Sequence, residues 1–198
     1  EVHRHEVLDG IFLYLREMVV RVGGEDGWNR LVRAYFDQHP MYHFHLNHNA
    51  VHVPKFVLSL DAEALGFALP EFAPDLADFE WWEWQTQSAP DDESELSIDE
   101  GPLRLHGSVE LRPYAYDLLS WINSAEDPAS LPSTPPEKKD SLVLFWRDRS
   151  LSLRRDRVSP LEIQIIKAVC ENLRLDRELA AVVGVAFDEL AETAQDLH

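Results

Sequence analysis

The chain has 198 residues, of which 45% are apolar and 10% aromatic, so it is long and apolar enough for one folded domain or two small ones. Its 36 acidic residues outnumber its 18 basic ones, and the net charge of -18 disfavours a nucleic-acid partner, because phosphate binding relies on cations. The single cysteine, Cys170, allows no internal disulfide, and no apolar run reaches the ~18 residues of a membrane span. Since no basic-then-apolar leader opens the sequence, we expect a cytoplasmic protein with no membrane partner.

Helical periodicity dominates the first part of the chain. Apolar residues recur at three- and four-residue spacing over residues 8–22, which predicts one helix ended by a pair of glycines. A second helix is predicted over residues 26–38. It ends where His39 precedes Pro40, because the residue before proline avoids the helical conformation.

Three further helices are predicted after these. Short ones follow Pro54 and Asp61, and a longer one begins near Pro74, which suits a first helical turn. No strand pattern interrupts this succession, so we expect residues 1–87 to form a helical domain.

One loop of this part is rich in histidine. Five of the nine histidines fall in it: His39, His43, His45, His48 and His52. Imidazole groups bind transition metals, so a metal site is one hypothesis. No acidic residue or cysteine lies between Gln38 and Leu60 to complete a ligand set. We therefore assign no metal to this chain, and the sequence leaves open whether the loop binds one.

The helix after Pro74 carries two carboxylates among tryptophans. These are Glu80 and Glu83, beside Trp81, Trp82 and Trp84. Such a carboxylate pair can act as acid and base, but the Glu-x-x-His of the di-iron helical proteins is missing. We expect the tryptophans to pack inward and the glutamates to face water or a partner. No nucleophile elbow or phosphate-binding loop occurs elsewhere, so we assign no catalytic residue.

The second part of the chain changes character. Residues 88–102 are rich in acids and predict a solvated connection. A strand is predicted over residues 103–112 and one or two helical turns over residues 116–122. Residues 124–140, rich in proline, serine and charge, predict a second flexible connection.

The clearest local pattern predicts a β-hairpin. Residues 141–147 form a strand that is apolar on both faces, and residues 150–155 alternate, with Leu151 and Leu153 on one side. Asp148 and Arg149 make a tight turn between them. No third strand follows, so one side of this small sheet is expected to stay open.

Helices are predicted after the hairpin. Ser159 and Glu162 form a capping box around Pro160 and open a helix to residue 173 that turns Cys170 inward. Two more helices are expected over residues 176–183 and 187–197. The predicted fold is α+β: an N-terminal helical unit, then a small antiparallel sheet with helices, winged-helix-like, over residues 103–198.

The hairpin region is basic, in contrast to the rest of the chain. Seven basic and four acidic residues lie between Glu137 and Arg157, a local net charge of +3. A basic hairpin can steer an anionic partner, and charge can equally guard an edge strand against aggregation. Both interpretations stay open at this point.

Several stretches together resemble a known family. They are residues 24–40, which end in His39-Pro40; residues 76–84, Leu-Ala-Asp-Phe-Glu-Trp-Trp-Glu-Trp; residues 105–111 with residues 116–121; and the hairpin over residues 142–155. Their order and motifs resemble a bacterial family of HvfC type, labelled DNA-binding, which is related to partner subunits of methanobactin and thiaglutamate maturation.

The resemblance implies a non-catalytic partner subunit. Such proteins pair with a TIM-barrel multinuclear iron oxygenase, hold the leader of a ribosomally made precursor peptide, and present its cysteine for oxidation. The iron would be on the partner enzyme, with no cofactor on this chain. The implied peptide-binding residues are Leu142, Leu144, Trp146, Leu151, Leu153, Arg154 and Arg155, on an open sheet edge. Trp81, Trp82 and Trp84 are the implied partner interface, because tryptophan is enriched among interface anchors.

Two alternatives come from other classes. The first is a DNA-binding winged-helix-like regulator, which needs a basic recognition helix, whereas residues 161–173 offer Lys167 against Glu162 and Glu171. The second is a metal enzyme that uses the histidine-rich loop. The sequence leaves open which precursor peptide is bound, how it is modified, and in what stoichiometry.

Overall fold

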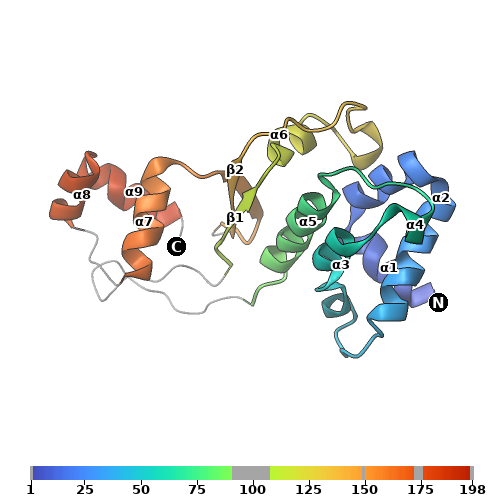
Figure 1. Cartoon of the computed structure of the whole chain (residues 1–198). Coiled ribbons are helices and arrows are strands. Elements are labelled where there is room, and N and C mark those ends of the chain that lie inside the picture. Colours follow the sequence, from blue (N-terminus) through green and yellow to red (C-terminus); the bar gives the residue numbers. More distant parts are fainter. Residues whose placement is uncertain (1, 91–107, 149, 172–175, 197–198) are drawn as a thin grey trace. The chain divides into compact units, whose positions relative to one another are not determined.

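The computed structural model describes most of the chain (Figure 1), namely residues 2–90, 108–148, 150–171 and 176–196. Helices make up most of it, and its strands form one small antiparallel sheet. The predicted α+β class is therefore confirmed.

The chain divides into two compact units. The first contains Glu1–Trp84 and Tyr114–Ser141, and the second contains Gln85–Pro113 and Leu142–His198. These bounds differ from the predicted domains, residues 1–87 and 103–198, because residues 114–141 cluster with the N-terminal helices.

Two helices open the first unit: α1 (Val2–Ile11) and α2 (Leu13–Gln38). The prediction of one unbroken helix over residues 8–22 is wrong at Phe12, whose φ of -105° and ψ of 62° separate α1 from α2. Phe12 is itself fully buried, so its side chain remains part of the core at this break.

Glu80, on α5 (Ala73–Gln87), supports the start of α2. Its carboxylate accepts hydrogen bonds from the N–H groups of Tyr14 at 2.6 Å and Leu15 at 2.9 Å. First-turn N–H groups have no partner within their own helix, and the helix dipole favours a negative charge there. The expectation that Glu80 faces water or a partner is therefore wrong, since it is 2% exposed.

The predicted glycine stop coincides with a kink inside α2. Gly24 has a φ of 69° and a ψ of 177°, a conformation that glycine adopts without the strain of a side chain. The helix ends at His39 as predicted, where the His39 N–H donates to the Tyr35 carbonyl at 2.7 Å.

The short predicted helices are also present. They are α3 (Val53–Ser59) and α4 (Ala62–Leu65), and the turn η1 (Leu46–Ala50), which was not predicted, precedes them. Asp61 caps α4 by accepting from the Ala64 N–H at 2.7 Å. With α2 and α5 these elements enclose the core of the first unit, whose largest fully buried side chains include Trp28, Tyr35, Phe36 and Phe79.

Residues 114–141 complete the first unit with α6 (Leu118–Asn123) and η2 (Pro128–Ser130). The prediction of a flexible connection over residues 124–140 is wrong, because side chains hold it in place. Arg21 donates to the carbonyls of Ala129 and Leu131, each at 2.8 Å. Trp121 donates through Nε1 to the carbonyl of Thr134 at 2.8 Å.

The sheet lies in the second unit apart from its end residues Tyr114 and Ser141. Its strands are β1 (Glu110–Tyr114), β2 (Ser141–Arg147) and β3 (Leu153–Arg157), in the order β1-β2-β3. The predicted hairpin is confirmed as β2 and β3. The strand predicted over residues 103–112 is present as β1 from Glu110 onward, and residues 103–107 lie outside the described part. β1 pairs with β2, so β2 is the central strand and β3 lies at one edge.

Helices follow the sheet in the chain: α7 (Pro160–Cys170), α8 (Arg177–Val183) and α9 (Phe187–Asp196). The predicted capping box is confirmed, with Glu162 N–H donating to Ser159 Oγ at 3.2 Å and Ser159 N–H donating to Glu162 Oε2 at 2.6 Å. Cys170 is exposed, so the prediction that it points inward is wrong. Residues 173 and 197, the predicted helix ends, lie outside the described part.

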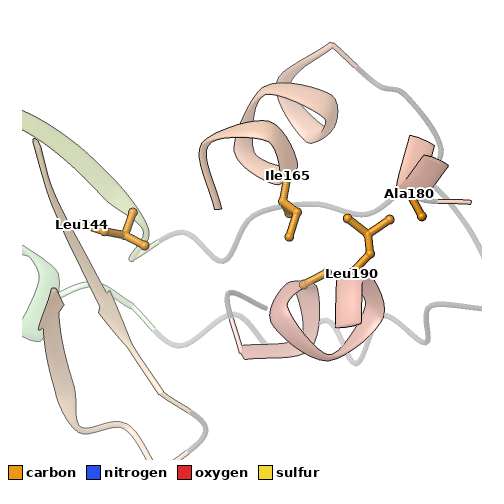
Figure 2. Close-up of a cluster of buried hydrophobic side chains, with 5 residues drawn as sticks. Leu144, Ile165, Ala180 and Leu190 are labelled. Carbon is orange, nitrogen blue, oxygen red and sulfur yellow. The ribbon is translucent and has the colours of Figure 1, made fainter. Parts of the chain in front are cut away.

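The core of the second unit joins β2 to these helices. It contains Leu144, Ile165, Ala180, Leu190 and Ala194. Figure 2 shows Leu144 extending from β2 on the side of the helices, with Ile165 of α7 and Leu190 of α9 pointing toward each other. None of the helices in the described part of the chain is long and apolar enough to span a bilayer.

Candidate functional site

β3 forms one edge of the sheet. Because β2 lies between β1 and β3, no strand of the described part borders β3 on the side away from β2. An edge strand presents a row of backbone donors and acceptors, and an extended peptide can add to it as a further strand. This edge is the candidate site that the hairpin prediction pointed to.

The direction of the β3 backbone groups follows from two hydrogen bonds at its ends. The N–H of Val158 donates to the Leu142 carbonyl at 3.2 Å, and the N–H of Asp148 donates to the Ser152 carbonyl at 3.0 Å. Both pairs continue the register of the β2–β3 ladder. In an antiparallel ladder, opposite residues alternate between pairs that exchange backbone bonds and pairs that do not.

The backbone N–H and C=O groups of two residues of β3 are therefore directed toward β2, and those of the other three are directed away from it. Arg154 and Asp156 stand in the bonded positions, opposite Trp146 and Leu144. The backbone groups of Leu153, Arg155 and Arg157 are directed toward the outer edge. Arg155 and Arg157 have other interactions within the chain, so an added strand would take the place of any that involve these groups.

The apolar residues predicted to bind a peptide on β2 belong to the core of the second unit. Leu144 is fully buried in the cluster with the C-terminal helices, and Trp146 is partly buried against the same cluster. Leu142 is half-buried near the start of β2, and its carbonyl accepts a hydrogen bond from the Val158 N–H. Leu144 and Trp146 thus lie on the side of the sheet that packs against the C-terminal helices.

The remaining predicted residues lie on β3 or just before it. Leu151 is not in the strand as predicted; it stands in the connection with a φ of 63° and is 48% exposed. Leu153 and Arg155 are half-buried, and Arg154 is exposed. Arg154 donates through Nε to Asp148 Oδ2 at 2.7 Å, which joins the strand to the turn before it.

Asp148 organises that turn, a role that sequence reasoning missed. Its Oδ1 accepts from Ser150 Oγ at 2.6 Å, from Ser150 N–H at 2.9 Å and from Ser152 N–H at 3.0 Å. The bond from the Ser150 hydroxyl has the largest effect on the pKa of Asp148, and together these bonds hold that pKa well below its ordinary value. The signal was an aspartate followed two and four residues later by serine, because aspartate side chains bond the backbone two residues on.

A cavity of about 800 Å³ lies close to the end of β3 in the second unit. It is lined by Ser159, Pro160, Leu161, Glu162, Gln164, Val185, Glu189 and Thr193. Arg157, the last residue of β3, is two residues before Ser159 in the chain. The cavity therefore adjoins the segment that follows β3, and its lining combines apolar groups with Glu162 and Glu189.

The three tryptophans of α5 are not equivalent. Trp81 is 5% exposed and packs against Trp84, with ring centroids 5.0 Å apart. Trp82 and Trp84 are partly exposed. Of the predicted interface residues, Trp82 and Trp84 can therefore touch a partner as the unit stands, and Trp81 supports Trp84 from the core.

The histidine-rich loop brings three imidazoles together. The ring centroid of His43 is 4.9 Å from that of His48 and 5.7 Å from that of His45. His43 and His45 are stacked, and His43 Nδ1 accepts from the backbone N–H of His45 at 3.1 Å. Among the described residues, no group of three or more His, Cys, Asp or Glu side chains is arranged to hold a metal ion.

Burial and mutual repulsion act on these imidazoles. Burial, followed by the nearby His43 and His45, lowers the pKa of His48 below its ordinary value of 6.5. Burial and then His52 do the same for the pKa of His39. Both shifts favour the neutral ring, as expected where one imidazolium would be desolvated beside another.

Comparison with known proteins adds no family to this description. The chain matches no model of a known protein family, and no curated protein is significantly similar to it.

Proposed function

We propose that this chain is a non-catalytic partner protein that binds an extended peptide along β3 and presents it to an enzyme. The observation that carries this proposal is the edge position of β3, with the backbone groups of Leu153, Arg155 and Arg157 directed outward. Strand addition uses such a row, since backbone hydrogen bonds supply affinity and alternating side chains supply specificity.

The charge of the strand supports an acidic peptide. Three of the five residues of β3 are arginines, in a chain whose net charge is -18. Because positive charge is concentrated here, an anionic segment would be steered to this edge rather than to other surfaces. The cavity lined by Glu162 and Glu189 would accept a neutral or basic side chain beyond the end of β3.

The finer proposal follows the resemblance of the sequence to partner subunits of peptide maturation. The peptide would be the leader of a ribosomally synthesised precursor, and the enzyme a cytoplasmic TIM-barrel iron oxygenase that oxidises a cysteine of the precursor. We assign no catalytic residue and no cofactor to this chain, so the iron would be held by the enzyme. Trp82 and Trp84 are the side chains proposed to contact it, because both are partly exposed aromatics.

The test uses two proline variants of neighbouring residues. Leu153→Pro removes an outward N–H, so we expect it to abolish binding of a synthetic leader peptide while the β2–β3 ladder survives. Arg154→Pro removes an inward N–H and is the matched control that damages the ladder itself. Binding is measured by titration calorimetry, and folding by thermal unfolding.

Hydrogen exchange with and without the leader locates the site. The proposal predicts new protection at Leu153, Arg155 and Arg157 and little change at Arg154 and Asp156. Protection confined to other parts of the chain, or a Leu153→Pro variant that folds and binds the leader as tightly as the wild type, would refute the assignment.

DNA binding is the second candidate, favoured by the arginines of β3. The adjacent helix α7 weakens it, because its Lys167 is accompanied by Glu162 and by Glu171 at its C-cap. A mobility-shift assay at low salt decides between the two: specific retardation of duplex DNA that falls steeply with added salt would favour the DNA-binding regulator.

A further inference from the structure

The loop between α2 and α3 exposes an unusual amount of apolar surface. Tyr42 is 67% exposed, Phe44 is 82% exposed and Leu46 is 48% exposed. Val51 and Leu58 follow close behind, so five of the nine exposed large hydrophobic residues of the described part lie between residues 42 and 58. Single exposed apolar residues are ordinary, whereas a group of them marks an interaction surface. Residues 42–48 are called the aromatic loop below.

The aromatic loop is held in shape by one buried side chain. The Asn49 side chain accepts from the N–H groups of Tyr42 at 2.8 Å and His43 at 2.9 Å. Its amide nitrogen donates to the carbonyls of His43 at 3.0 Å and Leu46 at 2.8 Å. Asn49 is 1% exposed, so the side chain that makes these part-buried bonds is itself buried. A loop ordered in advance loses little conformational freedom when it binds.

The rings of the aromatic loop already stack on one another. Phe44 lies 4.8 Å from His43 at an interplanar angle of 17°, and 4.1 Å from His45. The series continues inward from His43 to His48 and from His48 to Trp84. Aromatic rings pack favourably on other aromatic rings, so a surface built from them is complementary to itself.

Charge singles out the same segment. No carboxylate lies between Asp37 and Asp61, and Lys55 is its one lysine or arginine. A chain with a net charge of -18 repels its own copies through the carboxylates elsewhere on its surface. Two copies that meet through this segment bring no carboxylate of the segment itself into the contact.

We propose that the aromatic loop is the docking surface for a second copy of this chain. The two loops meet around a two-fold axis, so that Phe44 and Tyr42 of each copy pack on the rings of the other. A two-fold interface requires one patch that fits itself, and the exposed stacked rings of the aromatic loop provide such a patch. This association goes beyond the proposed peptide binding and does not depend on it.

Sedimentation velocity over a concentration series tests the proposal. The buffer contains a reductant, because the exposed Cys170 would otherwise link copies by a disulfide. We expect the wild type to form a dimer and the double variant Tyr42→Ser with Phe44→Ser to weaken it by about tenfold or more. Both side chains are mostly exposed, so the variant should keep the thermal midpoint of the wild type.

Leu13→Ser is the matched control, since Leu13 is a 50% exposed apolar residue outside the loop. It should leave the association unchanged. A wild type that stays monomeric up to about 1 mM would overturn the proposal and assign the surface to a different protein. So would a dimer that the double variant leaves intact, or one that Leu13→Ser weakens equally.

Discussion

The aromatic loop of the first unit and the β2–β3 turn of the second unit are both shaped by one side chain. Asn49 is buried and neutral, and it makes four hydrogen bonds to the backbone of its loop. Asp148 accepts four bonds, but it is charged and lies in a turn whose serines are exposed. Asn49 and Asp148 make the same number of hydrogen bonds, so this number alone does not set how much each side chain contributes to stability. The free energy lost when one of these hydrogen bonds breaks depends on whether water can replace the missing partner.

The largest effect is expected from Asn49→Ala. The variant leaves the Tyr42 and His43 N–H groups and the carbonyls of His43 and Leu46 without their partner in a partly buried site. Leaving such groups unsatisfied lowers the free energy of unfolding by about 1–3 kcal/mol. Urea denaturation measures this loss. Asn47→Ala, at an exposed position of the same loop, is the control and should change stability by less than about 0.5 kcal/mol. Equal losses of unfolding free energy in Asn49→Ala and Asn47→Ala would show that the burial of Asn49 is not the cause of the effect.

An intermediate effect is expected from pH, and it separates the two regions. His39 and His48 have pKa values lowered below 6.5, so the unfolded chain binds protons more readily than the folded one. Their contribution to stability is fully present above pH 6.5 and is lost as the pH falls from 6.5 through the lower pKa values of the folded state. The pKa of Asp148 is lowered from 3.8, so its contribution is present above that value and is lost only in stronger acid.

Urea denaturation at a series of pH values checks this order. The free energy of unfolding should begin to fall below about pH 6.5, where histidine titrates. His48→Gln should flatten that part of the profile, because it removes the ring that faces His43 and His45. The Asp148→Asn variant should keep the slope near pH 6 and alter the profile below pH 3.8. If the double variant His39→Gln with His48→Gln keeps the same slope of unfolding free energy against pH near pH 6, the assignment of that slope to these two rings is wrong.

The smallest effect is expected from Asp148→Ala at neutral pH. Water can bond the exposed groups of Ser150 and Ser152 when the carboxylate is removed, so the loss of stability should be well below that of Asn49→Ala. The same urea series measures it, and Asp156→Ala, an exposed aspartate on β3, is the control. A loss as large as that of Asn49→Ala would break the contrast between the two regions.

Local signals in the sequence were sufficient for much of the fold. The kink at Gly24, the stop at His39, the cap of Asp61 and the capping box of Ser159 each depend on residues within a few positions of one another. The hairpin could be predicted for the same reason, since alternation and a turn residue are properties of a short segment. The aspartate–serine pattern after Arg147 is equally local, since Asp148 bonds the N–H groups two and four residues on.

Contacts between distant parts of the chain were beyond such signals. The break at Phe12 accompanies a carboxylate at Glu80, which bonds Leu15 from 65 positions away. The exposure of Cys170 and the anchoring of residues 124–140 by Arg21 also depend on what lies across the unit. Periodicity cannot show which face of a helix the rest of the chain will cover.

The candidate site divides in the same way. The hairpin of β2 and β3, the basic character of β3 and the acid-free aromatic loop can all be read from consecutive residues, because composition and alternation are local properties. The pairing of β1 with β2, and the packing of Leu144 and Trp146 against the cluster of the C-terminal helices, depend on the tertiary structure. It also decided that Leu153, Arg155 and Arg157 present their backbone outward. Register is the physical reason, since a shift of one residue would turn every backbone group and side chain of β3 to the opposite side.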